Sequence, residues 1–280
     1  MLAGQQHACS TPFSPTGSRL GYYLQATLNA MSTKNDKPVA VVTAAAQRLG
    51  RAIALAFARA GYDLVVHYRA SRAQAEETAE LATACGARAV VLGANLAIRA
   101  TAEEFVANCL SAFARVDVLV ANAGAFERTP VNEFSDDACQ RMLADNLFAT
   151  LWVARAFGVE MRARGGGSIV ALADVAALRP WRGYLAYNIA KAGVVALVRT
   201  LAKELAPEVR VNAIAPGPVL FPPGFDPQAR QREIERTLLK REGLPDHVAD
   251  AALFLCRNDY VTGVVLPVDG GRLLAGDDGY

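Results

Sequence analysis

Apolar residues along the chain form two alternating patterns, short continuous runs and longer stretches with a helical period. Residues 38–43 form the first run, which is rich in β-branched side chains and predicts a buried strand. Residues 47–60 then carry apolar side chains at helical spacing, and Gly61 follows them as a helix-terminating residue. The first strand is therefore predicted to lead directly into a helix.

The same alternation continues to the end of the chain. Further strands are predicted at residues 63–68, 87–93, 117–121, 168–173, 209–214 and 264–268. Helices are predicted at residues 71–85 with Ser71 as the cap, 101–114, 135–164 with a break near Asp145, 183–205, 227–241 and 245–256. The strands are apolar throughout, which is typical of a parallel sheet covered on both faces. We expect one α/β domain over residues 37–280, with a doubly wound parallel sheet of seven strands.

Residues 1–36 do not share this pattern. They are rich in Ser, Thr, Gly, Gln and Pro, and no charged start precedes an apolar run, so a secretory signal is not indicated. An organelle-targeting peptide, a disordered arm, or an extension upstream of a true start at Met31 all fit. We expect the disordered arm or the extension.

Composition narrows the class of protein. Hydrophobic residues make up 52% of the chain and charged residues 20%, which is enough apolar surface for a sizeable core. A net charge of +2 gives no reason to expect nucleic acid or an anionic membrane as a partner. The 5 cysteines are widely spaced and the 3 histidines do not cluster, so we expect a reducing, cytoplasmic setting and no metal site.

One pair of polar residues has a spacing with chemical meaning. Tyr187 and Lys191 lie four apart in a predicted helix, and therefore on one face. A cation beside a phenol lowers its pKa from about 10 toward neutral, which makes a usable general acid. Asp174, further upstream, adds a carboxyl group that can hold or pass a proton. The spacing alone equally fits a half-buried tyrosine beside a surface lysine.

The turn after the first strand predicts a phosphate-binding site. A tight turn into a helix N-terminus presents free N–H groups and a positive dipole end to a pyrophosphate. Gly50 is present for close helix packing, whereas Ala44 and Arg48 stand where glycines are expected. A β-carbon at residue 44 crowds the turn if that residue needs a positive φ.

The end of the second strand indicates which dinucleotide is bound. It carries no acid to hold a ribose 2′-hydroxyl, and has Arg69 and Ser71 instead, which suit a 2′-phosphate. Arg48 adds a second cation nearby. These residues predict NADPH/NADP as cofactor, and the alternative is that Arg69 is a solvated loop arginine.

Taken in order and spacing over residues 37–272, these features resemble the short-chain dehydrogenase/reductase family. The motifs are the turn at 43–50, Asn122-Ala123-Gly124, Asn146, Tyr187-x-x-x-Lys191, Pro216-Gly217 and Val268-Asp269-Gly270-Gly271. The resemblance implies a Rossmann-type fold and a homotetramer. Subunits would pair through the helix of Tyr187, whose apolar face holds Val194, Leu197, Val198 and Leu201.

The resemblance also implies residue roles. Tyr187 would be the proton donor, Lys191 would lower its pKa and bind the nicotinamide ribose, and Asn146 would hold a water that links Lys191 to solvent. Pro216 and Gly217 would lie beside the nicotinamide. The other expected cofactor contacts are Arg48, Leu49, His67, Tyr68, Arg69, Ser71, Asn95, Leu96, Asn122, Ala123 and Gly124.

Asp174 stands where the family normally has a serine that binds a substrate carbonyl. An ionised carboxylate repels a developing alkoxide, whereas an Asp–Tyr pair suits a ring nitrogen that gains a proton. Asp174, Arg48, the run 67–71, Phe126 and Tyr184 together resemble the pteridine reductase branch, including the dihydromonapterin reductases. That branch implies substrate contacts from Arg48, Phe126, Asp174, Tyr184 and Tyr187, with Phe126 stacked on the pterin. Packing roles for Phe126 and Tyr184 are the alternative.

Three functions follow from these residues. The first is NADPH-dependent reduction of a dihydropterin to a tetrahydropterin, by hydride transfer with protonation assisted by Tyr187, Asp174 and Lys191. The second is a carbonyl or 3-oxoacyl reductase of the same family. The third is a non-catalytic NADPH-binding sensor or scaffold, left open because Ala44, Asn95 and Ala121 depart from the family pattern. Gly124 also differs, because many pteridine reductases have a serine there.

Overall fold

The computed structural model describes residues 37–275, and the expected N-terminal arm at residues 1–36 lies outside them. Within the described residues one sheet of seven parallel strands has the order β3-β2-β1-β4-β5-β6-β7. The strands are β1 (Val39–Val42), β2 (Asp63–Tyr68), β3 (Ala89–Gly93), β4 (Val118–Ala121), β5 (Gly167–Leu172), β6 (Val209–Pro216) and β7 (Val265–Val268). The predicted doubly wound α/β fold is confirmed.

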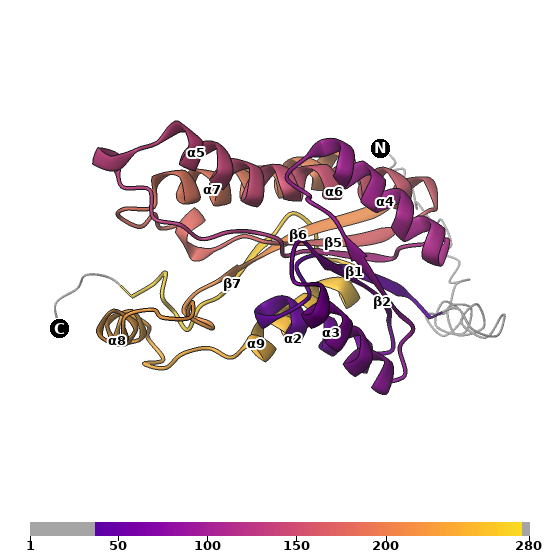
Figure 1. The fold of residues 1–280 in the computed structure, drawn as a ribbon, viewed down its shortest axis with the longest axis horizontal. Coiled ribbons are helices and arrows are strands. Elements are labelled where there is room, and N and C mark those ends of the chain that lie inside the picture. The colour runs from indigo at the N-terminus through magenta and orange to yellow at the C-terminus, as the bar shows by residue number, and fades with distance from the viewer. Residues whose placement is uncertain (1–36, 276–280) are drawn as a thin grey trace, which may run out of the picture. The chain divides into compact units, whose positions relative to one another are not determined.

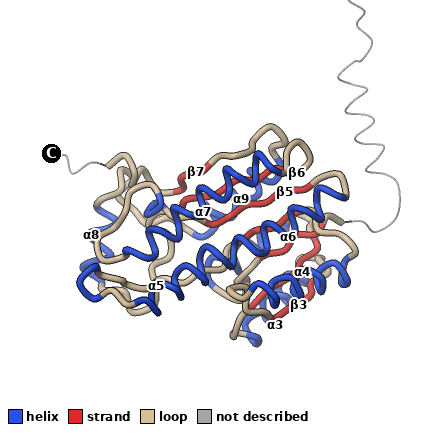
Figure 2. The backbone as a smooth tube through the Cα atoms, turned by 90° about the horizontal axis from the view of Figure 1, so that it is seen from above, coloured by secondary structure: helices blue, strands red, loops and turns tan. Residues whose placement is uncertain are grey.

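Helices cover both faces of this sheet (Figure 1). One face carries α4 (Arg99–Phe113), α5 (Asp136–Leu143), α6 (Ala149–Ala163) and α7 (Leu185–Glu204), and Figure 2 shows α4, α6 and α7 lying side by side over the strands. The other face carries α2 (Arg48–Arg59), α3 (Arg72–Ala84) and α9 (Pro245–Arg257). Because both faces are covered, every residue of the central strands β1 and β4 is buried.

The strand order reverses between β1 and β4. The chain moves outward from β1 to β2 and β3, then returns to place β4 on the other side of β1. Loops after neighbouring strands diverge at such a point and leave a crevice at the carboxyl ends, where ligands of open α/β sheets bind. The segments after β1, β2, β3 and β4, which hold most of the predicted site residues, therefore lie at one edge of the sheet.

The helix predicted at residues 135–164 is broken as expected. It consists of α5, a π-helical segment at Ala144–Phe148 that holds Asp145 and Asn146, and then α6. A π-helical turn widens the helix and redirects side chains, which is common at functional sites. Two details were wrong. The predicted helix at 227–241 ends early, as α8 (Pro227–Glu235), and the side chain of Ser71 makes no capping bond to α3.

Helix α7 is long and apolar enough to span a membrane by length and composition, with a mean hydropathy of 1.3 over an 18-residue window. Its apolar side chains have another explanation, because α7 packs on the sheet and buries Val194 and Val198 in the core of its own chain. Those two residues are therefore not available for the subunit pairing predicted for this face. The homotetramer stays a prediction.

Candidate active site

The turn between β1 and α2 is held in an unusual conformation. Ala44 has a φ of 50° and Arg48 a φ of 56°, so the turn adopts the left-handed backbone that glycine would favour. Gly50 is required by close packing, since a Cβ there would lie 2.1 Å from the carbonyl oxygen of Ala44. The side chain of Asn122 fastens the turn to β4 by donating to the Thr43 carbonyl at 3.0 Å. The expected crowding at residue 44 is thus tolerated with the β-carbon in place.

His67 supports this turn from the end of β2. Its Nδ1 accepts a hydrogen bond from the Ala44 N–H at 2.9 Å, so its Nε2 carries the proton and donates to the Ala94 carbonyl at 3.1 Å. Burial lowers the pKa of His67 to about 4, because a buried imidazolium would lose its hydration. The predicted cofactor residue His67 therefore joins the ends of β1, β2 and β3 as a neutral ring.

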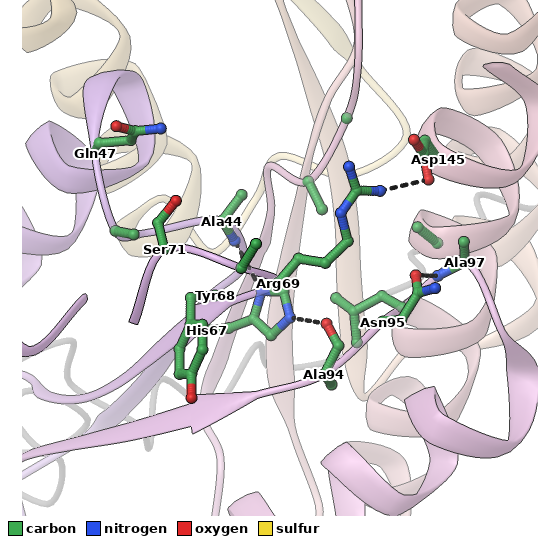
Figure 3. A pocket seen from close by; sticks show the side chains of 16 residues that line it. Ala44, Gln47, His67, Tyr68, Arg69, Ser71, Ala94, Asn95, Ala97 and Asp145 are labelled. Carbon is green, nitrogen blue, oxygen red and sulfur yellow. Dashed lines mark hydrogen bonds and ion pairs between the residues drawn. The ribbon is translucent and has the colours of Figure 1, made fainter. Parts of the chain in front are cut away.

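A cavity of about 220 Å³ opens beside this turn (Figure 3). Eight of the predicted cofactor residues line it: His67, Tyr68, Arg69, Ser71, Asn95, Leu96, Ala123 and Gly124. Sequence reasoning missed Gln47, Asp145 and Ala149 among the lining residues. The sequence around Asp145 predicts a helix, but it does not predict the direction of the Asp145 side chain. The π-helical segment directs that side chain to the cavity.

Other predicted cofactor residues lie outside the cavity lining. The guanidinium of Arg48 donates to the carbonyl oxygens of Leu220 at 2.8 Å and Phe221 at 3.3 Å, so it joins the first turn to the loop after β6. Leu49 lies in α2 after the turn, Asn122 supports the turn, Pro216 ends β6 and Gly217 follows it. Their contacts with a dinucleotide stay predictions.

Tyr187 and Asp174 are in direct contact. The Tyr187 hydroxyl donates to Oδ2 of Asp174 at 2.8 Å, and Oδ1 of Asp174 accepts from the Ala176 N–H at 2.7 Å. Lys191 is buried one helical turn away, where its Nζ donates to the Leu172 carbonyl at 2.9 Å and lies 5.7 Å from the centre of the Tyr187 ring. The fold therefore brings three predicted catalytic groups together.

The electrostatics of this group differ from the sequence-based expectation. The pKa of Tyr187 is raised well above its usual value, by burial first and then by the negative charge of Asp174, and not lowered by Lys191. Burial also raises the pKa of Asp174, against the opposing effects of the Ala176 N–H and Lys191. Burial lowers the pKa of Lys191 to about 8. The predicted acidification of Tyr187 by Lys191 is therefore wrong for this arrangement, because burial and then the negative charge of Asp174 both raise the pKa of Tyr187.

Asn146, the fourth predicted catalytic residue, is buried in the π-helical segment. Its Nδ2 donates to the carbonyl oxygens of Ala125 and Met142, each at 3.0 Å. Gly124 lies between Asn146 and Lys191, and a Cβ there would lie 2.7 Å from Oδ1 of Asn146. This packing gives a physical reason for the departure to glycine at residue 124. The water relay expected of Asn146 stays a prediction.

Three aromatic side chains, those of Phe126, Trp181 and Tyr184, form a cluster with the ring of Tyr187. Phe126 stacks on Tyr184 with ring centres 4.7 Å apart, and meets Tyr187 edge to face at 5.0 Å. Trp181, which sequence reasoning did not single out, packs parallel to Tyr187 at 6.4 Å. Phe126 remains 41% exposed, so one part of its surface is free to contact a planar ligand.

The cavity residues fit the adenosine half of a nicotinamide dinucleotide. Within the described chain Gln47 makes no side-chain cap to α2, so the first N–H groups of that helix remain available to phosphate. Arg69 and Ser71 supply a cation and a hydroxyl at the cavity mouth, and Asn95 supplies an amide. Apart from the carboxylate of Asp145, this set of backbone donors, one cation and neutral side chains suits an anionic nucleotide.

The chain is similar to known oxidoreductases. A family model described as "Enoyl-(Acyl carrier protein) reductase" matches residues 44–272. L-rhamnose 1-dehydrogenase (NAD(P)(+)) of Sphingomonas sp. (strain SKA58) is 35% identical, covering 82% of this chain and 94% of its own. Pteridine reductase 1 of Leishmania tarentolae is 32% identical, covering 87% and 99%. The crystal structure of acetoin dehydrogenase from Enterobacter cloacae superposes with a TM-score of 0.81 at 28% identity, covering 88% and 100%.

Proposed function

The chain belongs to the short-chain dehydrogenase/reductase family of NAD(P)-dependent oxidoreductases, and from that premise we propose that it reduces a pterin ring with NADPH. The observation that carries the proposal is the 2.8 Å hydrogen bond from the Tyr187 hydroxyl to Asp174. A dihydropterin, reduced to the tetrahydropterin, is the preferred substrate. Pteridine reductase 1 of Leishmania tarentolae is named for this kind of substrate, whereas L-rhamnose 1-dehydrogenase (NAD(P)(+)) is named for another.

The proton chemistry of Asp174 and Tyr187 supports a ring nitrogen as the acceptor. Tyr187 is protonated at neutral pH, and its raised pKa makes it a weaker acid, so its proton goes more readily to a basic ring nitrogen than to a weakly basic carbonyl oxygen. Asp174 has a raised pKa and touches the same hydroxyl, so in its protonated form it can return a proton to Tyr187. Lys191 supplies the positive charge that balances Asp174 in this half-buried group.

The dinucleotide would be held by the cavity after β1 to β4, with Arg69 and Ser71 facing the adenosine ribose. A 2′-phosphate at that position would meet the Arg69 guanidinium, which is the basis for preferring NADPH. When bound, the cofactor supplies the hydride. The chain itself orients the ligand, excludes water and holds the proton at the Tyr187 oxygen.

The exposed part of Phe126 supports a flat, electron-poor substrate ring. Phe126 is fixed by stacking on Tyr184 and by its edge contact with Tyr187, so it loses little freedom when a planar ligand binds. Such a contact contributes about 0.5–1.5 kcal/mol beyond the area it buries. The residue thus lies where a pterin near the Tyr187 hydroxyl would meet it.

A carbonyl reductase is the second candidate, and one observation favours it. Because burial raises the pKa of Asp174, the protonated carboxyl can donate a hydrogen bond to a substrate carbonyl as a serine would. In that case the proton from Tyr187 would go to a carbonyl oxygen.

The two candidates are separated by following NADPH oxidation with dihydrobiopterin or dihydromonapterin against a panel of ketones and 3-oxoacyl thioesters. Turnover of the pterins, with the carbonyl compounds inactive or much slower, is the expected result. Turnover of ketones alone would refute the pterin proposal in favour of a carbonyl reductase. Tight NADPH binding without any turnover would favour a sensor.

Replacing Asp174 tests the residue on which the choice depends. Asp174→Ser should lower kcat for the pterin by about a hundredfold or more, since it removes a proton-holding group next to Tyr187. Asp174→Asn keeps the shape and the hydrogen bond to Tyr187 but cannot carry the proton, and should lose as much. Unchanged pterin reduction in both variants would mean that Asp174 lies outside the proton path.

A further inference from the structure

Two opposite charges face each other across the mouth of the cofactor cavity. Nη1 of Arg69, at the end of β2, lies 2.8 Å from Oδ1 of Asp145, in the π-helical segment (Figure 3). Both side chains line the cavity. The Arg69 side chain is 58% exposed and that of Asp145 is 19% exposed. The ion pair therefore joins two elements that are far apart in sequence, on the surface where a dinucleotide would bind.

This ion pair contributes little to folding. Pairs with one well-exposed partner add little to stability, because water and salt screen the charges and two side chains lose freedom. The pair lies in a cavity otherwise lined by neutral side chains, so no second lining cation offsets the charge of Asp145. Arg48, in the first turn, is bound to the Leu220 and Phe221 carbonyls, and Arg51, in α2, is bound to the Ala46 carbonyl and the Glu77 carboxylate.

We propose that Asp145 is a specificity-determining residue that weakens binding of 2′-phosphorylated dinucleotides relative to those with a free 2′-hydroxyl. A 2′-phosphate must take the Arg69 guanidinium from Asp145, and it brings its own negative charge close to the carboxylate. A free 2′-hydroxyl does not need the Arg69 guanidinium and carries no negative charge for the Asp145 carboxylate to repel. Asp145 thus reduces the preference for NADP(H) over NAD(H) below the level that Arg69 and Ser71 would set.

The inference rests on the proposed function only for the placement of a nicotinamide dinucleotide in this cavity. It does not depend on the substrate. A direct measurement is therefore binding of NADPH and NADH alone, followed by the fluorescence of the reduced nicotinamide at fixed ionic strength.

Asp145→Asn should tighten NADPH binding by about three- to tenfold, because releasing Arg69 and removing the repulsion each contribute up to about fivefold. NADH affinity should change by less than about twofold. Asp145→Ala is the second variant, chosen because alanine favours the helical conformation if the asparagine variant folds poorly. Glu103→Gln is the matched control, since it removes a carboxylate paired with Arg99 on α4, away from the cavity lining.

Three results would overturn the proposal. Weaker NADPH binding in both Asp145 variants would mean that Asp145 orients Arg69 for the phosphate. Equally tighter binding of NADPH and NADH would mean that the Asp145 charge acts on the dinucleotide as a whole and not on the 2′-phosphate. Unchanged affinities for both would mean that the Asp145 charge does not affect dinucleotide binding. A wild-type protein that binds both dinucleotides but reduces only ketones would refute the pterin proposal and leave this inference standing.

Discussion

The buried imidazole of His67 makes the stability of the cofactor turn depend on pH. In the folded chain Nδ1 of His67 must accept from the Ala44 N–H, so it has to stay unprotonated. The pKa of His67 is about 4 in the fold, against 6.5 for an unperturbed histidine. The unfolded chain therefore binds more protons between these values, and the free energy of unfolding falls as the pH is lowered through them.

The size of the effect follows from the two pKa values. Each pH unit between them is worth about 1.4 kcal/mol, so the contribution of His67 to stability is roughly 3 kcal/mol near pH 7 and is lost by about pH 4. His67→Gln does not titrate, and it also loses part of the hydrogen bonding to Ala44 and Ala94, at a cost of about 1–3 kcal/mol. The variant should be less stable than the wild type near pH 7, and this difference in the free energy of unfolding should change by roughly 2–3 kcal/mol at about pH 4.5, so that it closes or reverses sign.

Urea unfolding at a series of pH values, followed by circular dichroism, measures both curves. Taking the difference between variant and wild type cancels the titration of groups that the two proteins share. A gap between wild type and His67→Gln that is the same at both ends of the pH range would refute the reasoning.

Two further predictions concern the same edge of the sheet. Gly50→Ala should lower the free energy of unfolding by about 3 kcal/mol, because its Cβ meets the Ala44 carbonyl oxygen at 2.1 Å. Gly158→Ala should cost less in the same denaturation experiment, since its Cβ meets only the end of a leucine side chain; equal losses would contradict this. The pKa of Lys191 is about 8, so its charge is lost as the pH rises through that value, and NADPH affinity should fall by about tenfold from pH 7 to pH 9. Lys191→Met should flatten this dependence while Lys203→Met, exposed on the same helix, should keep it; an unchanged slope in Lys191→Met would assign the effect to another group.

The fold was largely predictable from the sequence, because the pattern of apolar residues that defines each strand and helix is local to that segment. Runs of β-branched residues separated by helical periods occur only where strands are buried on both faces, and each strand was found close to its predicted bounds. Element ends were predicted less well. The helix from Pro227 ended early, before the Leu239 N–H that donates to the distant Gly270 carbonyl at 3.1 Å, and the side chain of Ser71 did not cap α3.

The candidate site could be predicted only in part. Tyr187, Lys191 and Asp174 were identified by spacing and resemblance, and the structure brings them together. The sign of the Tyr187 pKa shift was not predictable, because it depends on which charge lies nearer the hydroxyl and how much water remains.

Sequence alone determined the doubly wound sheet, the turn that precedes α2 and the list of candidate groups. Tertiary structure alone decided how those groups are paired: Tyr187 with Asp174, and Arg69 with Asp145. The two members of the second pair lie 76 residues apart, and a π-helical segment sets the direction of one of them. Periodicity records which face of an element is buried, whereas the distance between two charges depends on how separate elements pack.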